Sequence, residues 1–202
     1  MKVSEIFRSI QGEGRNQGRP CTFIRFAGCN LRCSWCDTPN ALSGGTEMDH
    51  DEIIARLYSL GGTYICITGG EPLLQGRPLL SLVETLAGFE YMIDIETNGT
   101  INFTALQDYA SICMDVKCPS SGERSDLSLL ADITGNDSVK FVVRDLVDCE
   151  YAAEVMRANH ISGELFFSPV EGSDAPAIAR YLIDSDLPAR LQLQLHKILG
   201  MI

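Results

Sequence analysis

Residues 22–38 read TFIRFAGCNLRCSWCDT, and this stretch decides the fold. Its first part, residues 22–27, is rich in β-branched and aromatic side chains, which is typical of a buried strand. The strand leads directly into a loop with three cysteines, Cys29, Cys33 and Cys36. Three thiolates at this spacing can ligate three irons of a [4Fe–4S] cluster and leave the fourth iron open. The stretch therefore predicts a reactive iron–sulfur site at the end of a strand.

On both sides of this stretch, short β-rich segments alternate with amphipathic helical segments, which indicates an α/β fold. The expected strands are residues 22–27, 64–68, 91–96, 111–116, 139–143 and 164–168. The expected helices are residues 49–60, 77–87, 103–110, 145–159 and 174–183, with Asp49, Asp145 and Asp174 as N-caps. Six β/α steps are fewer than the eight of a closed barrel. We therefore expect a single domain, residues 1–202, built as an incomplete, laterally open (β/α)6 barrel.

Polar, glycine-containing loops follow five of the expected strands. They read GCNLRCSWCDTPN, GGEP, TNGT, KCPSSG and PVEGSD in chain order. Because the carboxyl ends of parallel strands meet at one rim, we expect these loops to converge there and to build an active site. Residues 120–137 are polar and form a lid, a partner-binding loop or a plain connection.

The composition excludes several classes of function. A net charge of −11 and a pI near 4.6 argue against a nucleic-acid partner, whose phosphates need a basic surface, and favour a small-molecule substrate. The chain has no apolar run of about 20 residues and starts without the pattern of a signal peptide. We therefore expect a cytoplasmic protein with no membrane partner. In that reducing compartment, clustered cysteines indicate metal or redox chemistry.

The cysteine loop allows more than one interpretation. A zinc site remains an alternative if Asp37, His50 or Cys21 supplies a fourth ligand. Trp35, the one tryptophan, either shields a cluster and stacks near a purine or is a packing residue. The scattered cysteines carry no expected ligand role; they are Cys21, Cys66, Cys113, Cys118 and Cys149.

Three cysteines with this spacing, and an aromatic residue before the third, resemble the signature of the radical S-adenosylmethionine (SAM) superfamily. The resemblance implies the radical SAM type of open barrel, with the amino and carboxylate groups of SAM on the open iron of a [4Fe–4S] cluster. One electron then cleaves SAM to a 5′-deoxyadenosyl radical, which abstracts hydrogen from the substrate. The motif GGEP, residues 69–72, is by itself a turn; here it resembles the superfamily's motif for the SAM amino group.

Five segments resemble, in order and over nearly the whole chain, the 7-carboxy-7-deazaguanine synthase family. They are SIQGEG (9–14), the cysteine stretch, TGGEP (68–72), ETNGT (96–100) and the C-terminal QxHK (194–197). The resemblance implies conversion of 6-carboxy-5,6,7,8-tetrahydropterin to 7-carboxy-7-deazaguanine with loss of ammonia, on the way to queuosine or archaeosine. It also implies that SAM is regenerated, that Mg²⁺ is a further cofactor, that flavodoxin or ferredoxin donates electrons, and that the protein is a homodimer.

The resemblance also assigns contacts to the substrate. The expected contacts are Ile10, Gln11, Gly12, Arg25 and Thr68. Arg25 would pair with the substrate carboxylate, for which its planar guanidinium is suited, or else it points outward as a surface charge. Thr38 would coordinate Mg²⁺ beside the same carboxylate.

Further residues are assigned to SAM and to proton transfer. The expected SAM pocket consists of Gly70, Glu71, Asp115, Val116, Lys117, Ser168, Pro169, Val170 and Glu171. Glu13, Glu96 and His196 are the titratable candidates for moving protons or holding the pterin edge. Glu96 is the best placed, because its carboxylate can accept two hydrogen bonds from a guanidine-like edge. His196 is alternatively a satisfied histidine near the last strand.

Two other functions are weighed against this one. A glycyl-radical-enzyme activase also uses the cysteine spacing and a small open barrel, although SIQGEG and ETNGT argue against it. A non-catalytic iron–sulfur or zinc binding module would neither bind nor cleave SAM. Cleavage of SAM therefore separates the enzymes from the module.

Overall fold

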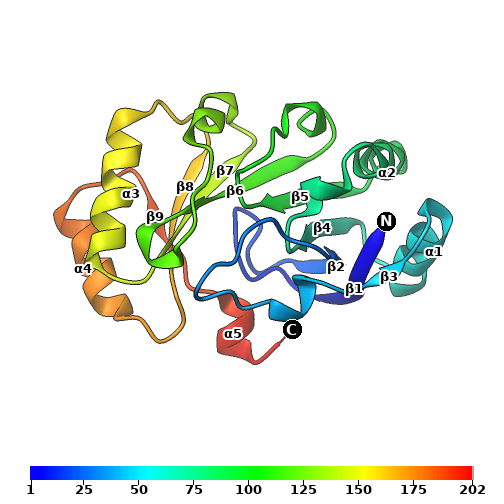
Figure 1. Ribbon diagram of the computed structural model, residues 1–202, viewed down its shortest axis with the longest axis horizontal. Coiled ribbons are helices and arrows are strands. Elements are labelled where there is room, and N and C mark those ends of the chain that lie inside the picture. Colours follow the sequence, from blue (N-terminus) through cyan, green and yellow to red (C-terminus); the bar gives the residue numbers. More distant parts are fainter. Residues whose placement is uncertain (202) are drawn as a thin grey trace.

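The computed structural model describes residues 1–201 and contains a single sheet that stays open at both edges (Figure 1). Its strands are β1 (Lys2–Ile10), β2 (Pro20–Phe26), β3 (Thr46–Glu47), β4 (Tyr64–Gly69), β5 (Met92–Thr97), β6 (Ser111–Lys117), β7 (Ser138–Val143), β8 (Glu164–Pro169) and β9 (Arg190–Leu191). They lie in the order β3-β1-β2-β4-β5-β6-β7-β8-β9. Pairing is antiparallel between β1 and its neighbours and parallel from β2 to β9. The predicted incomplete, laterally open α/β barrel is confirmed.

The helices are α1 (His50–Leu60), α2 (Arg77–Gly88), α3 (Leu146–Ala158), α4 (Ala175–Asp184) and α5 (Leu195–Leu199). Three predicted N-caps are confirmed. Asp49 accepts a hydrogen bond from the Glu52 backbone and completes a capping box. Asp145 and Asp174 cap α3 and α4 by accepting hydrogen bonds from backbone N–H groups of the first turn. No helix within residues 1–201 is both long and apolar enough to cross a membrane.

Alternation along the parallel strands separates an apolar face from a polar one. Ile65, Ile67, Ile93 and Ile95 belong to the main core, together with Leu79 and the other buried residues of the covering helices. Their neighbours in the chain point to the opposite, concave face, because successive side chains of a strand alternate. The concave face is therefore available for a site, and α1 to α4 stabilise the sheet from the other side.

One predicted helix is wrong. Residues 103–110 form only a short 3-10 turn, Thr104–Leu106, before β6 begins. The Asn102 side chain accepts hydrogen bonds from both the backbone and the hydroxyl of Thr104 at the start of this turn. Residues 120–137 are a plain connection rather than a lid, because their Leu129 and Leu130 are buried in the core.

Three strands were absent from the sequence prediction. The long strand β1 was not among the expected strands, whereas it pairs with β2 over most of its length. A register shift between Val3 and Glu5 interrupts its alternation, which hides the period of two. The other two, β3 and β9, are two residues long, so they carry no periodic signal.

Candidate active site

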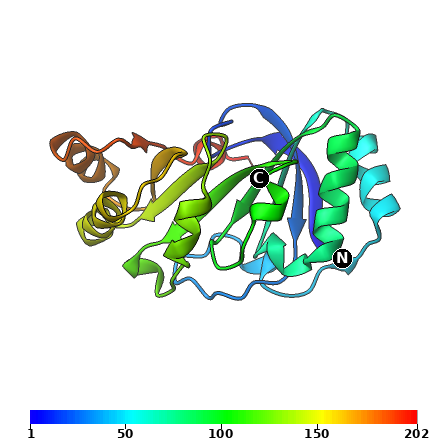
Figure 2. The ribbon, with the colours of Figure 1, turned by 90° about the horizontal axis from the view of Figure 1, so that it is seen from above.

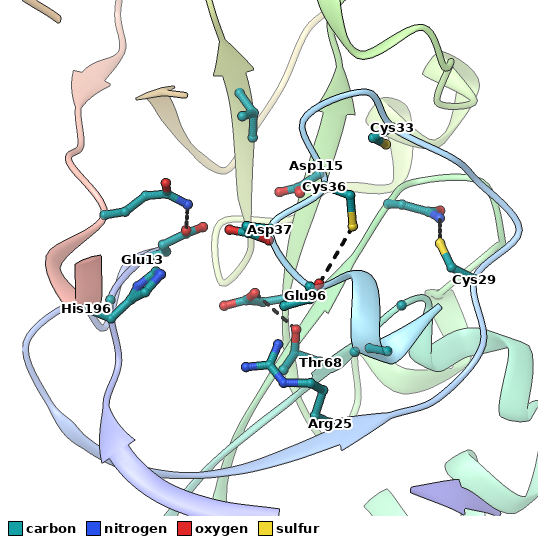
Figure 3. Close-up of a pocket in the computed structure, with 18 of the residues that line it drawn as sticks. Glu13, Arg25, Cys29, Cys33, Cys36, Asp37, Thr68, Glu96, Asp115 and His196 are labelled. Carbon is teal, nitrogen blue, oxygen red and sulfur yellow. Dashed lines mark hydrogen bonds between the residues drawn. The ribbon is translucent and has the colours of Figure 1, made fainter. Parts of the chain in front are cut away.

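A cavity of about 750 Å³ lies on the concave face of the sheet (Figure 3). Its walls come from the loop after β1, the cysteine loop, the ends of β4 to β7, and the segment that contains α5. The following predicted site residues line it: Ile10, Gln11, Gly12, Glu13, Arg25, Cys29, Cys33, Cys36, Thr38, Thr68, Gly70, Glu96, Asp115, Lys117, Val170, Glu171 and His196. The convergence predicted from the loops is thus present in one cavity.

The three clustered cysteines are free thiols, and all three line the cavity. The Cys29 sulfur accepts from the Leu31 backbone N–H at 3.4 Å and lies 3.9 Å from the Asn98 amide nitrogen. Such donors stabilise a thiolate that ligates iron. Burial raises the pKa of Cys33, and its neighbours Cys36 and Cys29 raise it further, while Lys117 opposes them. A bound metal centre would relieve this crowding by holding the thiolates.

The donor set fits a cubane better than a single metal ion. Within residues 1–201, no three His, Cys, Asp or Glu side chains form a ligand set for one ion. A cubane instead spreads its cysteine ligands over three irons. None of the three candidates for a fourth zinc ligand joins the cysteines in a ligand set within residues 1–201. Cys21 is buried in β2, His50 lies on α1 with its Nε2 at 3.0 Å from the Pro78 carbonyl, and Asp37 pairs with Lys197 at 3.0 Å.

The glycine turn after β4 packs directly beneath the cysteine loop. The Gly70 N–H donates to the Phe26 carbonyl at 3.2 Å, and a Cβ on Gly70 would lie 2.7 Å from the Cβ of Cys29. Only glycine allows this close approach. Glu71 does not line the cavity, because its carboxylate is buried and accepts from Leu73 N, Thr97 Oγ1 and Asn98 N; its assignment to SAM stays a prediction.

Arg25 points into the cavity rather than outward (Figure 3). Its Nε donates to Glu5 Oε1 at 2.7 Å across the β1–β2 pair, and its guanidinium lies 5.4 Å from the Phe7 ring centroid. These two contacts fix the side chain, and within residues 1–201 the terminal NH groups of the fork have no protein acceptor within hydrogen-bond distance. Such a held guanidinium is suited to a carboxylate ligand.

Glu96 lies at the floor of the cavity, where it accepts hydrogen bonds from Gln11 Nε2 and Thr68 Oγ1, both at 3.3 Å. Burial raises the pKa of the Glu96 carboxyl, although the nearby Lys140 ammonium opposes the change. A carboxyl with a raised pKa can gain or lose a proton nearer neutral pH than an ordinary glutamate. This supports a role for Glu96 in proton transfer or in binding a guanidine-like edge.

Two lysines and two carboxylates form a buried ionic network. The sequence analysis named three of these residues but did not predict that they form a network. Lys140 contacts Glu13 and also lies 3.1 Å from Asp115, which in turn is 2.9 Å from Lys117. Although burial raises it, the pKa of Asp115 is held below its usual value by Lys117 and Lys140. Lys140 was missed, yet a lysine between apolar neighbours in the fully buried strand β7 was a usable signal.

The C-terminal segment closes one side of the cavity. The Leu195 N–H donates to the Gly12 carbonyl at 3.1 Å, and both ribbon views place α5 beside the loop between β1 and β2 (Figures 1 and 2). His196 therefore lies against Gly12, on a helix rather than near a strand. Lys197 pairs at 3.0 Å with Asp37, which connects α5 to the cysteine loop.

The remaining assignments are only partly brought together. Lys117 lies 5.5 Å from the centroid of the Trp35 ring, so Trp35 is a wall of the cavity. Thr38 lines the cavity near the cysteine loop, with its hydroxyl 4.0 Å from the Cys36 sulfur. The structure keeps Val116, Ser168 and Pro169 out of the cavity, since Val116 points into the apolar core and the other two are buried in β8.

The comparisons with known proteins agree with this geometry. The family model of the Radical SAM superfamily matches residues 23–119. The 7-carboxy-7-deazaguanine synthase of Methanospirillum hungatei JF-1 is 50% identical over 201 residues, covering 100% of this chain and 86% of that protein. The one from Koribacter versatilis is 39% identical over 217 residues, covering 98% and 96%. The crystal structure of QueE from Escherichia coli matches with a TM-score of 0.75 at 21% identity, covering 96% of this chain and 94% of that one.

The open barrel, the cysteine loop and the glycine turn beneath it define a radical SAM enzyme. Its cofactors are a [4Fe–4S] cluster and SAM, and the residues around the cavity fit them. Similarity over the full length goes further. The chain belongs to the 7-carboxy-7-deazaguanine synthase family, whose enzymes also use Mg²⁺.

Proposed function

We propose that this enzyme converts 6-carboxy-5,6,7,8-tetrahydropterin to 7-carboxy-7-deazaguanine with loss of ammonia, in the biosynthesis of queuosine or archaeosine. The observation that carries the proposal is the single cavity, in which the cysteine loop faces Arg25 and Glu96. Arg25 offers a cation for a carboxylate, and Glu96 offers an acceptor for a guanidine-like edge. A carboxylated pterin needs both groups in the same cavity. The full-length relatives that bear the name of this activity support it.

The chain's own residues then act mainly by orientation. Arg25, fixed by Glu5 and Phe7, binds the substrate carboxylate with its free NH groups. The backbone of residues 10–12 and the hydroxyl of Thr68 contact the pterin ring, and Glu96 accepts from its guanidine-like edge. Holding the ring at two ends fixes the carbon that loses hydrogen, which is how binding energy is converted to rate.

The cluster, SAM and Mg²⁺ would supply the chemistry that side chains lack. When bound, the cluster and SAM provide a 5′-deoxyadenosyl radical. Cys29, Cys33 and Cys36 would hold the cluster, and Gly70, Asp115, Lys117, Val170 and Glu171 would line the SAM pocket. Thr38 would offer a hydroxyl to Mg²⁺, whose remaining ligands are the substrate carboxylate and water. Glu13, Glu96 and His196 would move the protons that ring contraction and loss of ammonia require.

The proposed setting follows from the same chemistry. The substrate is a small molecule, and a radical SAM enzyme needs a reductant, for which we propose flavodoxin or ferredoxin. Eight free thiols support work in a reducing compartment, the cytoplasm. The net charge of −11 supports the absence of a nucleic-acid partner. A homodimer is proposed from the family, and sedimentation equilibrium of the purified protein tests it.

An anaerobic assay tests the proposed reaction. The iron–sulfur-reconstituted protein is mixed with SAM, reductant, Mg²⁺ and 6-carboxy-5,6,7,8-tetrahydropterin, and 7-carboxy-7-deazaguanine is measured by mass spectrometry. We expect product from the wild type and none from Cys33→Ala. Formation of 5′-deoxyadenosine without product would refute the substrate assignment and favour another radical SAM reaction, such as that of an activase. Failure to bind and cleave SAM would contradict the assignment to this class of enzyme.

A further inference from the structure

Lys140 lies outside every motif that points to function, yet it is at the centre of the buried ionic network. It is on β7, and only 4% of its side chain is exposed. Its ammonium contacts the Glu13 carboxylate, from the loop after β1, and the Asp115 carboxylate on the adjacent strand β6. A buried lysine is uncommon and needs such partners to remain charged.

The two carboxylates depend on Lys140 to different degrees. Asp115 has a second cation, Lys117, at 2.9 Å. Among residues 1–201, the Glu13 carboxylate has no cationic side chain other than Lys140 within 4.0 Å. A buried carboxylate that loses its cation is left with an uncompensated charge. Of the two carboxylates that Lys140 contacts, removal of its ammonium would therefore act mainly on Glu13.

Glu13 joins two segments that close the open side of the sheet. Its carboxylate accepts a hydrogen bond from the Gln194 side chain. The next residue, Gly14, exchanges two hydrogen bonds with the Gln192 side chain, at 2.7 and 2.8 Å. Residues 11–18 and 192–197 thus lie together, and the contact of Glu13 with Lys140 holds them to β7.

We propose that Lys140 is a positioning residue: its ammonium fixes the Glu13 carboxylate and, through it, the loop that presents residues 10–12 to the pterin. This inference rests on the proposed function, because it takes that loop as part of the substrate site. The proposed role predicts different effects on the binding of the two ligands, the pterin and SAM. Loss of the ammonium weakens binding of the pterin and leaves binding of SAM nearly unchanged, since Lys117 still holds Asp115.

The test measures binding rather than turnover. Dissociation constants for the pterin and for SAM are measured anaerobically by calorimetry on the reconstituted wild type, Lys140→Met and the control Lys2→Met, whose side chain is exposed on β1. We expect the pterin Kd of Lys140→Met to rise about tenfold, as coupling within a buried network predicts. Its SAM Kd stays within about twofold of wild type, and Lys2→Met changes neither constant.

A double variant shows whether Lys140 acts through Glu13. Glu13→Gln/Lys140→Met removes both charges, so position 13 carries no uncompensated charge. The double variant can therefore be compared with Glu13→Gln even if Lys140→Met fails to fold. We expect its pterin Kd to match that of Glu13→Gln within about twofold. A double variant about tenfold weaker than Glu13→Gln, or an unchanged pterin Kd in Lys140→Met, overturns the proposal. A wild type that neither binds the pterin nor forms the product would instead refute the proposed function.

Discussion

Gly12 is the residue at which added bulk meets the candidate site most directly. A Cβ at Gly12 would lie 2.8 Å from Cγ of the His196 imidazole, closer than van der Waals contact. Gly12→Ala must therefore displace the His196 imidazole from its place beside the cavity. We expect kcat/KM for the pterin to fall about a hundredfold, the size of effect that a 1 Å misplacement produces. Steady-state kinetics of product formation check it.

Gly88→Ala is the matched control for this substitution. Gly88 ends α2, and a Cβ there meets no atom within 4 Å. We expect wild-type kinetics from Gly88→Ala. If Gly12→Ala also behaved as wild type, the placement of His196 against Gly12 would have no role in the reaction.

His196 gives a prediction about pH. Burial lowers the pKa of its imidazole, and Lys197 adds to this, while Glu13 and Asp37 oppose it. As pH falls below about 6.5, the unfolded chain binds a proton at this histidine before the folded chain does, so the folded state loses stability. We expect urea unfolding to show a loss between pH 7.5 and pH 5.5 that is smaller in His196→Gln. An equal loss in both proteins would contradict the lowered pKa.

The sequence does not reveal in which direction each side chain points, and this limited the prediction of the residues that line the cavity. Residues that line the cavity were found where motifs mark them, as at Arg25 and Glu96. Val116 was assigned to the SAM pocket from the family resemblance, yet alternation turns it into the core. Glu71 belongs to a motif, but its hydrogen bonds to backbone and threonine are formed only in the folded chain. Lys140 lies in no motif, and its partners are distant in sequence.

At the scale of elements, the C-terminal segment depends on one glutamine. Gln192 is buried and forms two hydrogen bonds with the Gly14 backbone. We expect Gln192→Ala to lower the free energy of unfolding by about 1–3 kcal/mol, because buried backbone groups lose their partners. Hydrogen exchange should also quicken in residues 11–18. Chemical denaturation and exchange mass spectrometry measure both effects.

Leu193→Ala serves as the control, since this neighbouring side chain is exposed. We expect a change in unfolding free energy within about 0.5 kcal/mol for such a surface position. If Gln192→Ala were no more destabilising than Leu193→Ala, the segment would be held by other contacts.

Elements with a local signal were predicted, and those formed by long-range pairing were not. The six parallel strands and the N-caps Asp49, Asp145 and Asp174 are visible as apolar runs and capping residues. The strand β9 and helix α5 are too short for periodicity, and they are held by contacts with β8 and with the loop after β1. The helix expected between β5 and β6 is only the 3-10 turn Thr104–Leu106, and the packed connection of residues 120–137 leads from β6 to β7.

For the whole molecule, metal removal tests whether the cavity works as assigned. We expect treatment with a chelator to lower turnover and added Mg²⁺ to restore it, because in the proposed reaction the ion would be held by Thr38 beside the substrate carboxylate. Thr38→Ala should require a higher Mg²⁺ concentration for half-maximal rate. Rates of product formation against Mg²⁺ concentration measure this, and turnover that ignores the chelator would refute the role of the metal.

The central claim is that one cavity brings SAM to the pterin carbon that loses hydrogen. The most direct measurement follows deuterium from the C6 position of 6-carboxy-5,6,7,8-tetrahydropterin during anaerobic turnover by the reconstituted wild type. We predict that mass spectrometry finds the deuterium at the 5′ position of recovered SAM. The 5′-deoxyadenosyl radical would take the hydrogen from the substrate, and SAM would then be regenerated. Product formation with SAM and 5′-deoxyadenosine both free of deuterium would contradict the account.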